Sequence, residues 1–247
     1  MSMTREQVES GLKRDAGALD LRQQDLRRVD LSGLDLSRAN LSGADLRAAD
    51  LRRANLRGAD LSGAQMFEAD LEEADLEGAN LEGTDVRGVL RRARLRGVRG
   101  TGCDLQTANL ENATLQQALL DAAKIKDARL KGADLREASL RGATLNGSDL
   151  TGAVLRGARL AKADFTRAKL VGADLTTADL SGANFFLADL SGADLSHADL
   201  ASSSLFLAKL PGAKLASANL RGARLRGADL TGAHLEGAVM PDGSVHA

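Results

Sequence analysis

The chain has 247 residues, of which 43% are hydrophobic, so it is long enough to bury a sizeable core. It contains five Phe and no Trp or Tyr, which excludes an ordinary globular core filled by aromatic rings and indicates a repetitive architecture. The net charge of −1 argues against a generic nucleic-acid binder, and the single Cys excludes an internal disulfide framework.

Residues 1–18 are predicted to form an N-terminal cap that contains a short helix. Thr4 and Gln7 have the spacing of a capping box, in which each side chain bonds the backbone N–H of the other residue. Val8 and Leu12 would share one face of this helix. The cap would cover the first end of the regular region that follows, because an open end leaves backbone groups and core side chains exposed.

The longest region of the chain, residues 19–240, repeats with a period of five residues. The repeat has 45 central positions. One of them is Gly, a bulky apolar residue occupies all the others, and 38 are Leu. The position two residues before the centre is Ala in 35 of the 45 units, and 22 of the 26 Gly lie two residues after a centre. The residue just before the centre is usually Asp or Asn, so the consensus is A-(D/N)-L-x-G.

This period fits neither a helix, which needs apolar residues about every 3.6 positions, nor a simple strand, which needs them about every 2. A unit with one large and one small inward residue suits a chain that bends once per unit, and Gly after the centre can adopt the positive φ of such a bend. If four units close one square lap, residues n and n+20 become neighbours in adjacent laps. The laps would stack at about 4.8 Å, the strand-to-strand spacing, with their backbones paired.

The repeat from Leu19 to Met240 resembles that of the pentapeptide-repeat family, whose motif is A-(D/N)-L-x-x. This resemblance implies an all-β fold, a right-handed quadrilateral β-helix, in which the central residue and the preceding Ala point inward and the other three face solvent. At four units per lap, 45 units make about eleven coils.

One residue is missing from the repeat at 86–90, and the segment 87–104 is expected to form an irregular coil in which Gly100 holds a central position. The slip could be a kink within one coil or a loop that protrudes towards a partner. We favour the kink, because nothing has been inserted. Residues 241–247 form a short C-terminal tail whose Pro-Asp-Gly turn ends the repeats.

Two Phe-Leu pairs, 186–187 and 206–207, lie twenty residues apart at outward positions. A lap of twenty residues would place them one above the other as a single exposed apolar patch, and large apolar patches often mark interaction sites. The candidate protein interface is therefore formed by Phe186, Leu187, Phe206 and Leu207. Packing across a corner of the coil is the alternative interpretation.

Charge is segregated along the repeats. Residues 59–86 carry nine acidic side chains and no basic ones, and residues 87–100 carry six Arg and no acid. Neighbouring bands could compensate each other, or the acidic band could dock against a basic groove of a partner. The candidate acidic docking band comprises Glu68, Glu72, Glu73, Glu77 and Glu82.

We find no constellation of residues for catalysis, no cofactor motif and no metal-ligand loop, so we expect a protein that is not an enzyme and uses no cofactor. Cys103 replaces Ala at an inward position and is expected to be buried and inert. The N-terminus has no apolar export segment, and no run of 18 apolar residues occurs, so we expect a soluble, cytoplasmic protein without membrane contact.

The favoured function is a non-catalytic scaffold that binds a protein partner, with a homodimer also compatible and no direct nucleic-acid binding. The resemblance implies one alternative. Some family members, such as the quinolone-resistance Qnr proteins, look like B-DNA in width and negative charge and bind DNA gyrase. The chain would then be a DNA-mimicking binder or protector of DNA gyrase or a related type II topoisomerase, although it has a near-neutral charge and lacks long inserted loops.

Overall fold

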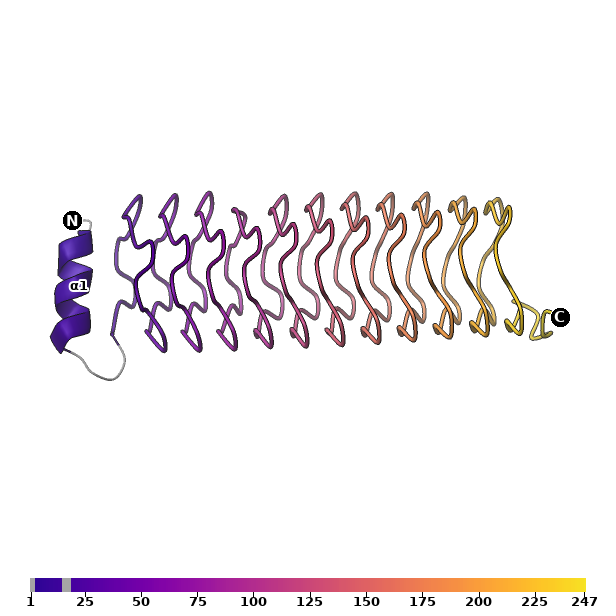
Figure 1. The fold of residues 1–247 in the computed structure, drawn as a ribbon, viewed down its shortest axis with the longest axis horizontal. Helices are drawn as coiled ribbons and strands as arrows, with labels where there is room; N and C mark the ends of the chain where they lie inside the picture. Colours follow the sequence, from indigo (N-terminus) through magenta and orange to yellow (C-terminus); the bar gives the residue numbers. More distant parts are fainter. Residues whose placement is uncertain (1–2, 15–18) are drawn as a thin grey trace.

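The computed structural model describes residues 3–14 and 19–247. A single helix, α1 (Arg5–Arg14), lies across one end of a long rod formed by the winding chain (Figure 1). Residues 1–2 and 15–18, which we assign to the predicted cap, lie outside the described residues. No helix in the described part of the chain is long and apolar enough to cross a membrane.

The rod is a β-helix solenoid in which each five-residue unit contributes a single-residue parallel β-bridge in place of a longer strand. Asp20 pairs with Asn40, Asn40 pairs with Asp60, and the same step of twenty residues continues on all sides of the rod. Backbone N–H groups donate to the next lap, as from Leu21 to the carbonyl of Asn40 at 2.8 Å. The predicted lap of four units is confirmed, because residues n and n+20 are neighbours.

Nearly every unit turns through one residue with positive φ, two positions after the centre, and Gly88 at the missing residue is an exception. Gly63 adopts φ +65° there, and nothing lies within 4 Å of the position of its missing side chain. Arg28 takes the same conformation at φ +59°, although L-residues with a Cβ disfavour it. The turn is thus imposed by the stacking of laps, and Gly is the residue that adopts it without strain.

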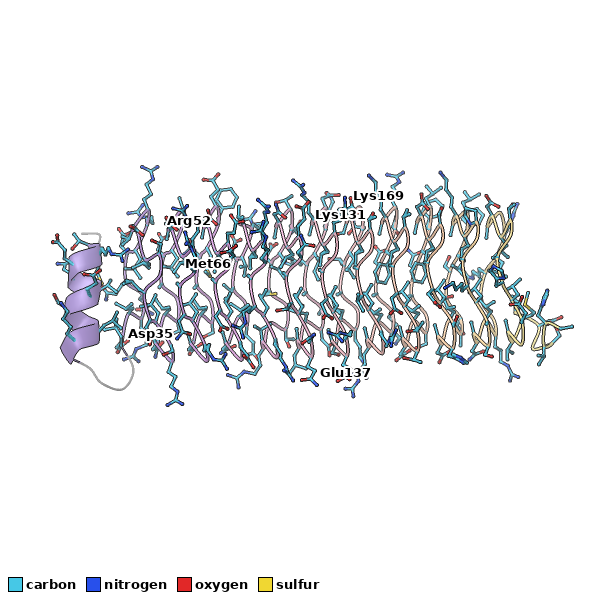
Figure 2. All side chains as sticks on the ribbon, in the orientation of Figure 1. Asp35, Arg52, Met66, Lys131, Glu137 and Lys169 are labelled. Atoms are coloured by element: carbon cyan, nitrogen blue, oxygen red, sulfur yellow. The ribbon has the colours of Figure 1, made fainter. Side chains whose placement is uncertain are left out.

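The interior is filled by the central Leu and the small residues two positions earlier, which are buried through most of the rod. Phe165 and Phe185 stack inside it with their ring centroids 5.0 Å apart and their planes at 3°, as the twenty-residue lap predicts. The outward positions carry polar and charged side chains, among them Arg52, Lys131, Glu137 and Lys169 (Figure 2).

The missing residue produces one short lap with no protruding loop. Four successive bridges, from Asp70–Val89 to Asp85–Asp104, join residues nineteen apart, and the spacing of twenty resumes with Val89–Asn109. Gly88 absorbs the deletion, because its N–H donates to the carbonyl of Val86 at 2.8 Å in a tight three-residue turn. Within the segment 87–104 the five-residue bridges continue without interruption.

Helix α1 covers the first lap through both polar and apolar contacts. The capping box is confirmed, since the Thr4 N–H donates to Gln7 Oε1 at 2.8 Å and the Gln7 N–H donates to Thr4 Oγ1 at 3.4 Å. Val8 is fully buried against the core. The Met3 N–H donates to the carbonyl of Asp25, and the Arg5 guanidinium donates to two further carbonyls of the first lap, those of Asp30 and Ser32.

Candidate protein-interaction surface

The twenty-residue lap brings the two Phe-Leu pairs into contact. The rings of Phe186 and Phe206 stack with centroids 5.6 Å apart and planes at 8°. Both rings are half-buried, whereas Leu187 and Leu207 are 40% and 41% exposed. These four residues, called the Phe-Leu ladder below, form one continuous apolar surface across two laps, where most outward positions of the rod are polar or small.

The two leucines of the ladder occupy the turn position with positive φ, at 57° for Leu187 and 56° for Leu207. A left-handed conformation costs an ordinary L-residue about 1 kcal/mol, and Gly would avoid that cost. Their backbone bonds to the next lap are also long, 3.3 and 3.2 Å, compared with 2.8 Å for Arg167 in the preceding lap. Gly at these two positions would form the same turn without this strain.

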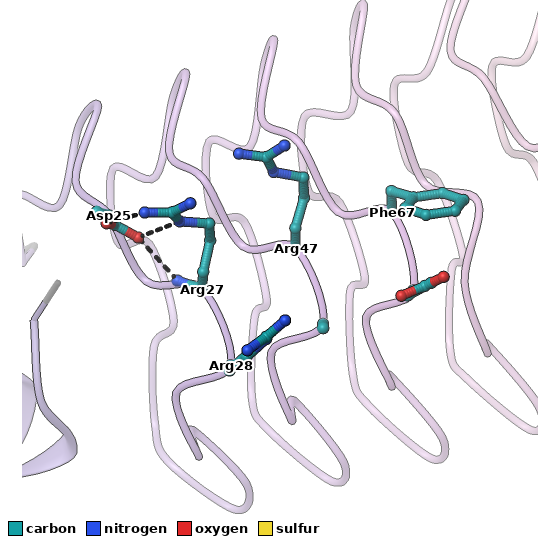
Figure 3. Close-up of a pocket in the computed structure, with 7 residues that line it drawn as sticks. Asp25, Arg27, Arg28, Arg47 and Phe67 are labelled. Carbon is teal, nitrogen blue, oxygen red and sulfur yellow. Dashed lines mark hydrogen bonds and ion pairs between the residues drawn. The ribbon is translucent and has the colours of Figure 1, made fainter.

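The ladder belongs to a column of side chains that runs the length of the rod. The sequence interpretation missed a second aromatic residue in this column, Phe67. Phe67 stands in the same column, 39% exposed, and the guanidinium carbon of Arg87 lies 4.9 Å from its ring centroid. Aligning positions at intervals of twenty residues, with one lap of nineteen at the missing residue, would have revealed it. A shallow groove beside Phe67 is shown in Figure 3 and is lined by Asp25, Arg27, Arg28, Arg47, Ala48, Phe67 and Glu68.

The positive charges of Arg27 and Arg47 in this groove are each neutralised by an Asp of the same repeat unit. The guanidinium of Arg27 binds both oxygens of Asp25 at 2.8 and 2.7 Å, a bidentate contact visible in Figure 3. Hydrogen bonds from Arg27 hold the pKa of Asp25 well below its ordinary value. The same arginine fork on the Asp two residues earlier recurs at Arg22, Arg47, Arg52, Arg87 and Arg136.

The structure places the candidate acidic docking band around the rod rather than on one side. Its residues follow four successive centres and so encircle one full lap: Glu68, Glu72, Glu73, Glu77 and Glu82. Three of them meet arginines of adjacent laps, in the pairs Arg57–Glu77 at 2.7 Å, Arg92–Glu73 at 2.9 Å and Arg91–Glu72 at 3.7 Å. Among the described residues, Glu68 and Glu82 take part in no ion pair. Neighbouring charged bands thus compensate each other in part.

The remaining chemically reactive groups are dispersed. The His side chains at 197, 234 and 246 are all exposed. Cys103 is buried, as expected, and desolvation raises the pKa of its thiol to about 12. No group of three or more His, Cys, Asp or Glu in the described ranges is arranged to hold a metal ion. The most distinctive element of the surface is the Phe-Leu ladder.

Comparison with known proteins agrees with this architecture. A family model for pentapeptide repeats matches residues 19–53, 44–83, 88–117, 118–157, 158–185, 183–222 and 208–241. No curated protein sequence matches the chain.

Among solved structures, the chain is similar to HetL, a pentapeptide repeat protein involved in heterocyst differentiation regulation from the cyanobacterium Nostoc, with 36% identity over 99% of this chain and 100% of that one and a TM-score of 0.42. A pentapeptide repeat protein from the Arabidopsis thaliana thylakoid lumen is 37% identical over 43% of this chain and 70% of its own, with a TM-score of 0.34. QnrB1, a plasmid-mediated fluoroquinolone resistance protein, is 22% identical over 86% and 92% of the two chains, with a TM-score of 0.36. The repeat model covers nearly the whole solenoid, and the chain belongs to the pentapeptide-repeat family.

Proposed function

We propose that the protein is a non-catalytic β-solenoid scaffold that binds a protein partner through the Phe-Leu ladder. The observation that carries the proposal is the pair of exposed leucines, Leu187 and Leu207, held in a left-handed turn beside two stacked rings. The same turn is made by Gly or by a polar residue at most other corners of the rod.

The energetic argument compares the cost of the ladder with what it can contribute on binding. Two left-handed leucines cost the isolated protein about 1 kcal/mol each. Burying an exposed aliphatic side chain contributes about 25 cal/mol per Å² of apolar surface, so a partner that covers the ladder more than offsets this cost. Buried aromatic side chains near the centre of a patch are frequent energetic anchors of interfaces, and the side chains around them exclude water.

The test is the double variant Phe186→Ser with Phe206→Ser, compared with the wild type in affinity capture from the native host and in light scattering after size exclusion. We expect loss of a specific partner or of self-association. Leu119→Ser is the matched control, because Leu119 is also exposed but lies in another column of the rod. If capture and oligomeric state are both unchanged in the double variant, the ladder is not an interface.

A DNA-mimicking binder of DNA gyrase or a related topoisomerase stays as the second candidate. It would use the acidic lap, of which Glu68 and Glu82 have no ion-pair partner among the described residues. A supercoiling assay with gyrase, run with and without the protein and a fluoroquinolone, tests it. Inhibition or protection that disappears in the variant Glu68→Gln with Glu82→Gln would support this candidate, and no effect on supercoiling would eliminate it.

The proposal also includes expectations that come from the sequence. The rod would wind right-handed in about eleven coils, at about 4.8 Å per coil. The protein would be cytoplasmic, would not bind nucleic acid directly and could form a homodimer. Light scattering of the purified protein measures the last of these directly, and a crystal structure of the rod determines the winding.

A further inference from the structure

The C-terminal end of the rod leaves a row of backbone donors without partners. Within the rod, the N–H groups of Leu205 and Leu207 donate to the carbonyls of Arg224 and Arg226 in the next lap, at 2.9 and 3.2 Å. One lap later the equivalent groups belong to Leu225 and Gly227, and in the described ranges neither has a backbone acceptor. The last lap therefore ends in an open β-edge, which is a template for pairing with another extended chain.

The C-terminal tail protects only part of this end. Val245 pairs antiparallel with Val239, and the Met240 N–H donates to the carbonyl of Ser244 at 2.7 Å. In Figure 1 the tail lies at one corner of the last lap and leaves the opposite corner uncovered. The central residues on the uncovered sides are only partly buried, unlike the Leu residues of earlier laps: Leu225, Leu230 and Leu235.

A hollow lies beside this open edge, where the last two laps meet. It is lined mainly by apolar surface and is formed by Ser204 and Phe206 of one lap and Arg224, Leu225 and Arg226 of the next. Both arginines are exposed, and neither forms an ion pair among the described residues. They differ in this from the forked arginines near the N-terminus, whose guanidinium groups are neutralised by their own Asp.

We propose that the edge from Arg224 to Gly227 binds an extended, acidic segment of another protein as one additional rung of the solenoid. The free N–H groups of Leu225 and Gly227 would donate to two carbonyls of that segment. An apolar side chain of the segment would cover Leu225 and Phe206, and its carboxylates would meet the guanidinium groups of Arg224 and Arg226. Phe206 belongs both to this hollow and to the Phe-Leu ladder, but the inference rests on the open edge and holds whether or not the ladder is an interface.

A second copy of the chain fits this edge poorly. Two C-terminal ends brought together would place Arg224 and Arg226 against the same positive residues. The other end of a second copy is already covered, because Met3 and Arg5 occupy carbonyls of its first lap. An extended acidic segment from a different protein would accept hydrogen bonds from the free N–H groups, cover the apolar surface and pair its carboxylates with the two arginines.

The probe is a fluorescein-labelled peptide, ADLEEADLEG, that copies residues 69–78 and has the inward spacing of one rung with outward carboxylates. Fluorescence anisotropy should show binding to the wild type, weakened about tenfold or more by Arg224→Glu with Arg226→Glu, since charge-assisted bonds are lost and like charges introduced. The control is Arg141→Glu with Arg159→Glu, which makes the same charge change at two exposed arginines in the middle of the rod, one just after a central residue and one just before the central residue of the next lap. This control should bind as the wild type does.

Two further measurements separate backbone pairing from simple charge attraction. A peptide of the same sequence with alternate amides N-methylated should bind about tenfold or more weakly, because it cannot pair along the edge. Hydrogen exchange should show new protection of the Leu225 and Gly227 amides and no change at Leu205. Phe206 is shared by the ladder and the hollow, so the single variant Phe186→Ser separates the two sites. It should leave peptide binding intact, because Phe186 does not line the hollow, while it weakens binding through the ladder.

Three results would overturn the proposal. One is no detectable binding of the acidic peptide, and another is equal binding of its N-methylated form. The third is a concentration-dependent dimer that is abolished by Arg224→Glu with Arg226→Glu, which would mean that a second copy occupies the edge.

Discussion

A Cβ atom on Gly88 would lie 2.3 Å from the carbonyl oxygen of Ala69, a contact far too short for two non-bonded atoms. The reason is the missing residue of the repeat. At this point one residue serves both as the turn of one unit and as the small inward residue of the next, and the backbone of the preceding lap lies directly against it.

Gly88→Ala should therefore destabilise the protein by about 3 kcal/mol, at the upper end of the range for overpacking, because the obstacle is backbone and cannot rotate away. Gly83→Ala is the control in the same lap. It has open space around the position of its Cβ but a φ of +64°, so it should cost only about 1 kcal/mol. Urea denaturation followed by circular dichroism measures both, and equal losses would refute the role assigned to Gly88.

Two buried serines offer a second matched pair. Ser148 Oγ donates to the carbonyl of Ile125 at 2.5 Å, whereas Ser203 Oγ is the one buried side-chain polar atom in the described ranges without a hydrogen-bond partner. Ser203→Ala should raise the free energy of unfolding by about 1 kcal/mol, because it removes an unsatisfied hydroxyl, and Ser148→Ala should lower it by about the same amount. Chemical denaturation would contradict this account if the two changes had the same sign.

Inward and outward positions should differ sharply in their tolerance of charge. Ala133 is fully buried in the middle of the rod, so Ala133→Asp should cost about 3 kcal/mol or more, since the carboxylate would have no partner in the core. Thr177→Asp, at an exposed turn with φ 58°, should change stability by less than about 0.5 kcal/mol. Limited proteolysis should detect opening of the rod near Ala133 only in the first variant.

The arginine forks should make the protein sensitive to acid. Hydrogen bonds from Arg87 hold the pKa of Asp85 below its ordinary value of about 3.9. A lowered pKa in the folded state contributes stability that is present above the ordinary pKa and is lost as the pH falls through the folded value. Stability should thus be flat from about pH 5 to 7 and fall below about pH 4. In Arg87→Gln, NMR titration should find the pKa of Asp85 closer to its ordinary value, and an unchanged pKa would be incompatible with the fork.

Cys103 provides a reporter of rod integrity. Burial raises the pKa of its thiol to about 12, so the reactive thiolate is absent at neutral pH and the sulfur is shielded from reagents. A thiol reagent at pH 8 should modify the native protein at a rate limited by opening of the rod, and should modify the urea-unfolded chain at once. Rapid labelling of the folded protein would show that this lap is open.

Several features of the fold could be predicted from the order of residues alone. The five-residue period, with Ala two positions before Leu, predicts which side chains are buried. The lap of twenty residues follows if four units close one square lap, as the resemblance to the pentapeptide-repeat family implies. The stacking of Phe165 on Phe185 and of Phe186 on Phe206 follows from that lap. These features are local and repeat in every unit, so they need no knowledge of the rest of the structure.

Only the tertiary structure decided the features that depend on how laps meet and where they stop. The acidic band encircles the rod, and its glutamates pair with arginines from two adjacent laps, which the linear separation of charge does not reveal. The deletion is absorbed by Gly88 alone, and the donors of Leu225 and Gly227 stay open because the tail turns back at another corner. A periodic sequence specifies the contacts within and between regular laps, whereas charge pairing, defects and ends depend on the arrangement of side chains and backbone around each site in space.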